Sequence, residues 1–101
     1  MNVEFLEPAR AEFIESVEHY NEQRRGLGLE FSQEVWATIE RIIRYPEAWS
    51  LMSKKTRRCR TNRFPFGIIY QVRRETLLII AVMNLRREPQ SWKTRIPTRT
   101  Q

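Results

Sequence analysis

Arginine side chains in the C-terminal half of the sequence are spaced in a way that suits the binding of an anion. Arg58 and Arg60 alternate along a basic run at residues 54–60, so in a strand both side chains would stand on one face. Further along the chain come Arg63, Arg86, Arg87 and Trp92. Guanidinium groups bind phosphates and carboxylates through paired hydrogen bonds, and an indole ring offers a surface for stacking. These six residues predict a cationic patch that holds phosphates and a stacked base.

Groups that transfer protons at neutral pH are scarce. His19 is the single histidine and Cys59 the single cysteine, so we predict no disulfide, no metal site and no cofactor. We expect His19 to lie at the surface near a helix end and Cys59 to be a half-buried strand residue. A general acid–base role therefore has no good candidate in the sequence.

Charge is distributed unevenly along the chain. Residues 1–52 carry ten glutamates against five arginines, a net charge of −5, whereas residues 53–101 carry thirteen lysines and arginines against two glutamates, a net charge of +11. A concentrated positive field raises the encounter rate with anions. The asymmetry favours a polyanion or an acidic protein segment as the partner of the C-terminal half.

The arginines need a rigid scaffold, and the sequence predicts one in three consecutive antiparallel strands. The basic run at 54–60 is followed by β-branched and aromatic residues at 63–72 and by the most apolar run of the chain at 77–83. Residues 73–76 have the length of a hairpin connection. Alternation directs four side chains of the middle strand toward one face, which we expect the helices to cover: Phe66, Ile68, Tyr70 and Val72.

The N-terminal half predicts a short strand at residues 2–6 and two amphipathic helices. Pro8 suits the first turn of a helix, and Pro46 ends the second one. The apolar stripe of the first helix contains Ala9, Phe13, Val17 and Tyr20, and that of the second contains Phe31, Val35, Ile39, Ile42 and Ile43. The fold class is α+β: a short N-terminal strand and an antiparallel helix hairpin packed on an antiparallel sheet of about four strands.

The length of 101 residues fits a single domain spanning residues 1–101. No run approaches the roughly 18 apolar residues of a membrane span, and the N-terminus lacks the pattern of a secretory signal. We expect a cytoplasmic protein that has no membrane partner.

Three segments give the chain a resemblance to a known family. The Gly-Leu-Gly turn at 26–28 followed by Phe31, the segment 63–72 and the closing segment 81–92 occur in the order strand, helix, helix, strands. In this respect the chain resembles the RelE/ParE superfamily of toxins from bacterial toxin–antitoxin modules, also called plasmid stabilisation proteins. The resemblance covers nearly the whole chain. It implies a compact, basic α+β toxin that inhibits growth and forms a complex with a cognate antitoxin, whose acidic segment covers the basic surface.

Two mechanisms occur in this family. RelE-like members cleave messenger RNA on the ribosome with strand lysines, a phosphate-binding arginine and an aromatic or histidine acid–base residue. By position, Arg58 and Arg60 match the strand lysines, Arg86 matches the arginine, and Trp92 lies where the acid–base residue would be. Indole does not exchange a proton at neutral pH, and Asn84 stands where many relatives carry histidine.

ParE-like members instead bind DNA gyrase, which requires a surface rather than a general base. The missing acid–base residue and the segments 26–28 and 64–67 favour this interpretation. A ribosome-dependent endoribonuclease stays open as an alternative, as does a non-toxic module that binds nucleic acid through the same patch.

Overall fold

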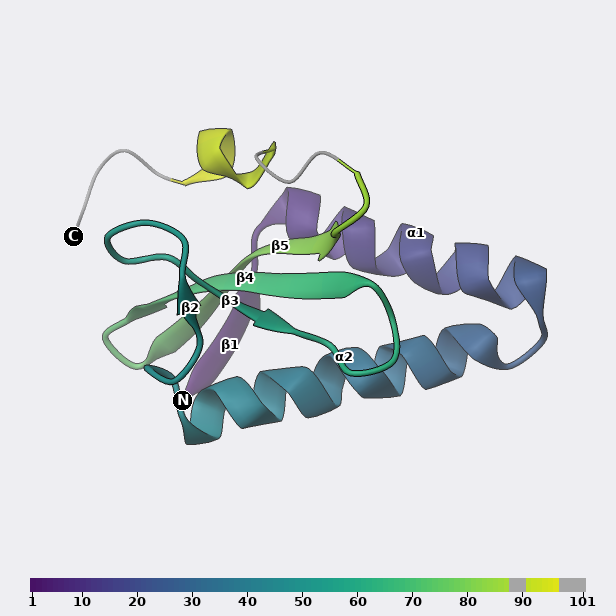
Figure 1. Ribbon diagram of the computed structural model, residues 1–101, viewed down its shortest axis with the longest axis horizontal. Helices are drawn as coiled ribbons and strands as arrows, with labels where there is room; N and C mark the ends of the chain where they lie inside the picture. The colour runs from purple at the N-terminus through teal and green to yellow at the C-terminus, as the bar shows by residue number, and fades with distance from the viewer. Residues whose placement is uncertain (88–90, 97–101) are drawn as a thin grey trace.

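The structure is a sheet covered by a helix hairpin on one face and by a short C-terminal segment on the other (Figure 1). It is a computed structural model and describes residues 1–87 and 91–96. The elements in chain order are β1 (Asn2–Phe5), α1 (Glu7–Gln23), α2 (Leu27–Arg44), β2 (Ser50–Leu51), β3 (Arg57–Arg60), β4 (Phe66–Arg73), β5 (Thr76–Asn84) and the 3-10 helix η1 (Ser91–Arg95).

The helix hairpin forms as the sequence predicts, and a short turn connects its two helices. Pro8 lies in the first turn of α1, where its missing N–H is not needed. Gly26 adopts a φ of 87°, a left-handed conformation that glycine tolerates without strain, and this lets α2 begin directly after α1. Arg24 to Gly26 are therefore the whole connection, and the two helices lie side by side in Figure 1.

The strand order is β1-β5-β4-β3-β2, so the sheet has five strands and is mixed. The prediction of three consecutive antiparallel strands is confirmed in β3, β4 and β5. The prediction of an antiparallel sheet of about four strands is wrong in two details. β1 pairs in parallel with β5 over residues 76–79, because the free edge of β5 offers it backbone partners, and the two-residue strand β2 extends the far edge.

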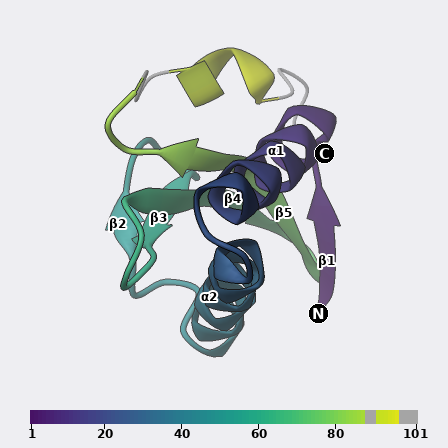
Figure 2. The same ribbon diagram turned by 90° about the vertical axis from the view of Figure 1, so that its right-hand side faces the viewer.

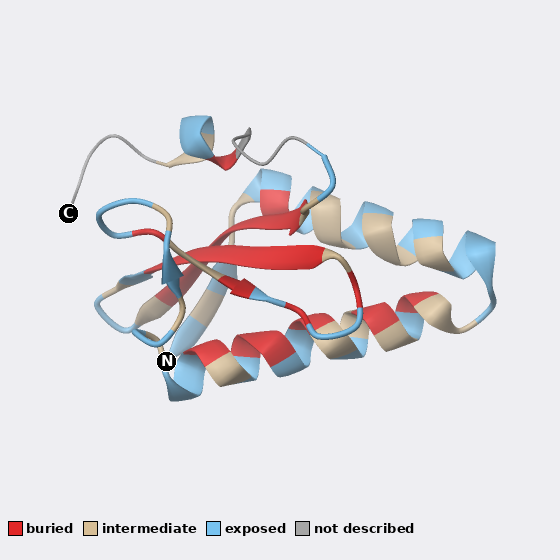
Figure 3. Ribbon diagram, viewed as in Figure 1, coloured by how far each residue is buried: buried red, intermediate tan, exposed pale blue. Residues whose placement is uncertain are grey.

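Two apolar layers enclose the sheet, and most of β4 and β5 is buried in Figure 3. On the helix side, Phe31, Val35 and Ile39 of α2 pack against the β4 residues Phe66, Ile68 and Tyr70. On the opposite face, Ile69, Leu78, Ile80, Ala81 and Met83 form a second cluster with Trp92 of η1. Figure 2 shows η1 across the sheet from α2.

Two expected core residues are more exposed than predicted. Val72 is on the helix-facing side of β4 but is 42% exposed and borders a small cavity beside Pro46 rather than a helix. Ile43 is 37% exposed, and Thr38 is buried in the apolar face of α2. The Thr38 hydroxyl donates a hydrogen bond to the Glu34 carbonyl at 2.8 Å, which makes its burial tolerable.

Gly28 is required by the close approach of α1 and α2. A Cβ at this position would collide with the carbonyl oxygen of Val17 and lie 2.7 Å from the Asn21 side chain. We expect Gly28→Ala to destabilise the protein by about 1–3 kcal/mol through overpacking, although alanine favours a helix more than glycine does. Chemical denaturation measures the effect. Gln33→Ala on the exposed face of α2 is the control, and a stabilised Gly28→Ala variant would contradict this packing.

Tyr70 ties the loop after α2 to the sheet, since its hydroxyl donates to the Pro46 carbonyl at 2.6 Å. Burial raises the pKa of Tyr70 from 10.0 to about 12, and nearby Arg57 opposes this rise. An unfolded chain therefore releases the phenolic proton at lower pH than the folded one, so its stabilising contribution is complete below pH 10 and is lost as the pH rises toward about 12. Free energies of unfolding measured across this range should fall more steeply for the native protein than for Tyr70→Phe; parallel curves would refute the assignment.

Candidate functional site

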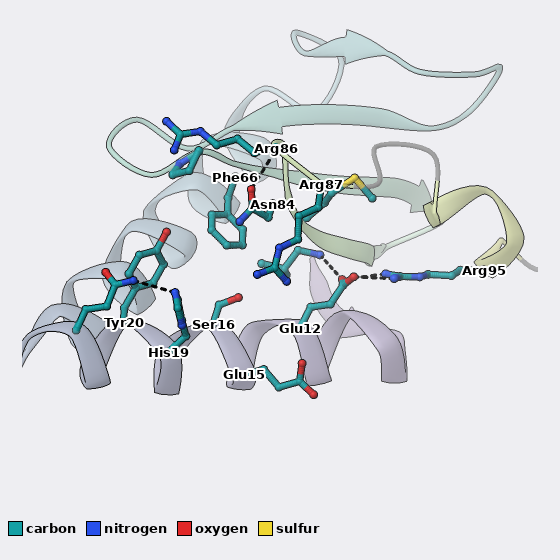
Figure 4. Close-up of a pocket in the computed structure, with 14 residues that line it drawn as sticks. Glu12, Glu15, Ser16, His19, Tyr20, Phe66, Asn84, Arg86, Arg87 and Arg95 are labelled. Carbon is teal, nitrogen blue, oxygen red and sulfur yellow. Dashed lines mark hydrogen bonds and ion pairs between the residues drawn. The ribbon is translucent and has the colours of Figure 1, made fainter.

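A groove of about 970 Å³ lies between α1 and the C-terminal end of β5 (Figure 4). This volume is at the upper end of the range of about 300–1,000 Å³ that ligand pockets span. Its lining combines polar groups of α1 with cations that follow β5: Glu12, Glu15, Ser16, His19, Tyr20, Gln23, Pro65, Phe66, Val82, Met83, Asn84, Arg86, Arg87 and Arg95. The groove therefore contains residues from both the acidic N-terminal half and the basic C-terminal half of the sequence.

An ion pair between Glu12 of α1 and Arg95 of η1 closes one end of the groove. The guanidinium of Arg95 donates to both carboxylate oxygens of Glu12, at 2.6 and 2.8 Å, and this raises the pKa of Arg95. The same two side chains also contact the backbone of β5. Glu12 accepts a hydrogen bond from the Val82 N–H at 3.0 Å, and Arg95 donates to the Ile80 carbonyl at 3.2 Å. The pair thus holds η1 against the sheet.

The other end of the groove is cationic. The Asn84 side-chain oxygen accepts the Arg86 backbone N–H at 2.9 Å, which shapes the turn that brings Arg86 and Arg87 to the groove. In Figure 4 the Arg87 side chain reaches from the end of β5 toward α1. Burial raises the pKa of Tyr20, and the charge of Arg86 opposes this rise.

His19 is on the α1 wall of this groove, next to Tyr20. Its Nε2 lies 2.9 Å from the side-chain nitrogen of Gln23, and the residue is exposed, as the sequence predicted. No carboxylate is hydrogen-bonded to the ring among the contacts of the described residues, so the ring lacks the partner that orients a general base.

Arg58 and Arg60 lie on the face of the sheet away from the helices, because Cys59 between them points into the helix-side core. The stem of Arg58 packs over Gly67, where a Cβ would lie 2.9 Å from Arg58 Cδ, and its Nε is buried without a hydrogen-bond partner in the described structure. Arg60 is exposed. Cys59 is 1% exposed, more deeply buried than predicted, and burial raises the pKa of its thiol.

The structure does not bring the six predicted residues into one patch. β4 lies between β3, which carries Arg58 and Arg60, and β5, which leads to Arg86 and Arg87. Arg86 approaches Tyr20 on the helix side rather than Arg58 on the opposite face. The cations therefore form two surfaces, one on β3 and one in the groove.

Arg63 belongs to neither surface. It pairs with Glu30 of α2 at 2.9 Å and lies over the ring of Phe64, 5.1 Å from its centroid. The hydrogen bond from Arg63 lowers the pKa of Glu30. These contacts hold the loop between β3 and β4 against α2, and the place of Arg63 in a phosphate-binding surface stays a prediction.

Trp92 is 1% exposed, so the expectation of an exposed aromatic ring is wrong. The second face of β5 is strongly apolar, and Trp92 covers it together with Ile96. The indole Nε1 is buried and has no hydrogen-bond partner among the described residues. In this conformation the ring cannot stack on a base.

Four groove residues were not predicted from the sequence: Glu12, Ser16, Tyr20 and Arg95. A signal was present in α1, where Glu12, Ser16, His19 and Gln23 recur every three or four residues and form a polar stripe beside the apolar one. No group of three or more metal-ligating side chains occurs in the described part of the chain. None of its helices is long and apolar enough to span a membrane.

The comparison with solved structures finds a fold similar to that of this chain. No family model matches the chain, and no curated protein matches it. Among solved structures, the chain is similar to one from the chromosomal ParDE TA system of P. aeruginosa, with 15% sequence identity and a TM-score of 0.73. The match covers 84% of this chain and 96% of that one. The two chains share one fold. The α+β fold that the family resemblance implied is confirmed. In the closing segment 81–92, which contributed to that resemblance, residues 88–90 lie outside the described residues.

Arg95→Ala should loosen η1, because it removes two hydrogen bonds to a carboxylate and one to the β5 backbone. Hydrogen bonds to charged groups contribute about 1.5–3 kcal/mol, so we expect exchange of the Trp92 indole N–H to accelerate about 10- to 100-fold. NMR hydrogen exchange measures this, with the signal assigned from Trp92→Phe.

Arg10→Ala serves as the control for that experiment, since it removes the same charge from an exposed position on α1. Equal exchange rates in the native protein and in Arg95→Ala would mean that the Glu12–Arg95 pair does not hold η1 in place.

Proposed function

We propose that this chain is the toxin of a bacterial type II toxin–antitoxin module and that it acts in the ParE-like manner. The observation that carries the proposal is the fold similarity to a ParDE-system chain, which extends over 96% of that chain. A match of this extent covers more of the chain than one common motif. We also propose that the protein is located in the cytoplasm and forms a complex with a cognate antitoxin.

The charge distribution supports an antitoxin with an acidic segment. The C-terminal half carries a net charge of +11, and its cations include Arg60 on β3 and Arg86 and Arg87 at the groove beside α1. An acidic segment that wraps the toxin would neutralise both surfaces, which complementary potentials favour.

Gyrase is the favoured target because a binding surface suffices for this mechanism. Arg60 is exposed on β3 and Arg58 is partly exposed on the same face, so the two residues form the proposed target-binding surface. A nuclease would in addition need a group that moves a proton. Trp92 is enclosed by apolar residues, and indole does not exchange its proton at neutral pH, so it does not support that chemistry.

The test is a gyrase supercoiling assay with the protein made by cell-free synthesis, next to growth of a bacterial host in which the chain is induced alone. We expect inhibited supercoiling, growth arrest and an induced DNA damage response. The variant Arg58→Met/Arg60→Ala should weaken inhibition by about a hundredfold, because two charge-assisted contacts are lost while methionine retains the packing over Gly67.

Arg10→Ala/Arg44→Ala is the matched control, since it removes two exposed arginines from the helices. Codon-positioned cleavage of translated messages with intact supercoiling would replace gyrase by the ribosome as the target. Salt-sensitive binding to bare nucleic acid without growth arrest would instead identify a non-toxic binding module.

A further inference from the structure

Large apolar side chains are exposed along one side of α2. Leu29 is 61% exposed, Trp36 44% and Ile43 37%. They are spaced by seven residues, which is almost two full turns of an α-helix, so they lie in one line along the helix axis. In Figure 2, α2 lies at the edge of the molecule away from η1. Apolar side chains that gather in one stripe, rather than being scattered singly, indicate an interaction surface.

Trp36, at the middle of this stripe, is held in place by two aromatic neighbours. Its ring centroid lies 5.9 Å from that of Phe5 of β1 and 6.5 Å from that of Phe13 of α1, and both contacts are edge-to-face. These contacts orient the indole, and the rest of its surface is open to solvent. Tryptophan is among the residue types enriched at binding hot spots, and an indole that is already ordered loses little entropy on binding.

The apolar residues of the stripe are placed symmetrically about Trp36. Leu29 stands seven positions before it and Ile43 seven positions after it. If two copies of α2 pack antiparallel about a twofold axis at Trp36, each residue before Trp36 lies opposite the residue equally far after it in the other copy. Leu29 then meets Ile43 at both ends of the contact, and the two Trp36 rings meet in the middle.

The charged and polar residues around the stripe follow the same symmetry. Arg25 lies eleven positions before Trp36 and Glu47 eleven positions after it, so these opposite charges come together at both ends of such a pair. Both residues are exposed, and neither takes part in an ion pair between described residues. Ser32 and Glu40 are related in the same way, four positions from Trp36, which places a hydroxyl opposite a carboxylate. A second copy of the chain therefore complements this surface in charge as well as in apolar contacts.

We infer that the exposed stripe of α2 is a homodimer interface, in which α2 packs antiparallel on α2 of a second copy. Trp36 is its centre, Leu29 and Ile43 are the flanking apolar anchors, and Arg25 pairs with Glu47 of the other copy at each end. A contact between two identical surfaces about a twofold axis requires this kind of symmetry, whereas a contact with a different chain does not.

The proposed interface is separate from the surfaces described above. None of its residues lines the groove between α1 and β5, and Arg58 and Arg60 lie on the face of the sheet away from the helices. The inference therefore does not depend on the proposed function, and dimerisation and toxicity are tested independently.

Sedimentation velocity of the full chain, made by cell-free synthesis, measures the association. We expect a dimer fraction that rises with protein concentration between about 1 and 300 µM. Trp36→Glu should stay monomeric at the highest concentration, because its carboxylate would be buried at the centre of the interface without a partner. Ala37→Glu is the matched control: it adds the same charge at an exposed position about 100° around α2 and should dimerise like the native protein.

Charge exchange tests the register and leaves the apolar stripe intact. Arg25→Glu and Glu47→Arg should each weaken dimerisation about tenfold, because each places like charges together at both ends of the interface. The double variant Arg25→Glu/Glu47→Arg should restore the native dissociation constant to within about threefold. Both positions are exposed, so these variants decide the question even if circular dichroism shows that Trp36→Glu does not fold.

Three results would overturn the inference: a monomer at every concentration, equal dimerisation of folded Trp36→Glu and the native protein, or no rescue in the double charge exchange. A monomer that binds a different chain through Trp36 would also overturn it, because the surface would then belong to another partner.

Discussion

The rest of the structure depends on β5 being buried on both faces. Its helix-side residues pack under α1 and α2, and its opposite residues are covered by Trp92 and Ile96 of the C-terminal segment. A strand so apolar on both faces cannot leave either one in water without a large loss of hydrophobic free energy. The Glu12–Arg95 pair adds polar contacts to this apolar packing. It joins α1, η1 and the backbone of β5 through hydrogen bonds.

This covering of β5 decides where charge is available for a partner. With η1 across the second face, Trp92 is buried, whereas Arg60 of β3 and Arg86 and Arg87 after β5 are exposed. The two surfaces face different sides of the sheet.

In the groove beside α1, residues 80–84 of β5 have no strand partner on one edge in the described structure. Arg86 and Arg87, which line the same groove, form no ion pair with another described residue. Each feature alone is common on protein surfaces, since sheets have edges and exposed arginines are usually solvated. Their coincidence in one groove is more specific than either feature alone. Arg63 differs from Arg86 and Arg87 of the groove. It also belongs to the basic half of the sequence, but its contacts with Glu30 and Phe64 give it a role in packing.

The sequence by itself determined the two helices, the three consecutive antiparallel strands and the inward faces of α1 and β4, because these follow from periodicities of a few residues. It also determined the alternation of Arg58 and Arg60 with the buried Cys59. Only the tertiary structure decided that β1 joins β5 in parallel, that Trp92 is covered and that Arg86 lies across the sheet from Arg58. Such outcomes depend on residues far apart in the chain. Glu12 and Arg95 are separated by 83 positions, and no local pattern relates them. Strand pairing and the covering of the second sheet face depend on residues that are distant in sequence. When the chain folds, these residues must bury their apolar surfaces and pair their backbone hydrogen-bonding groups at the same time.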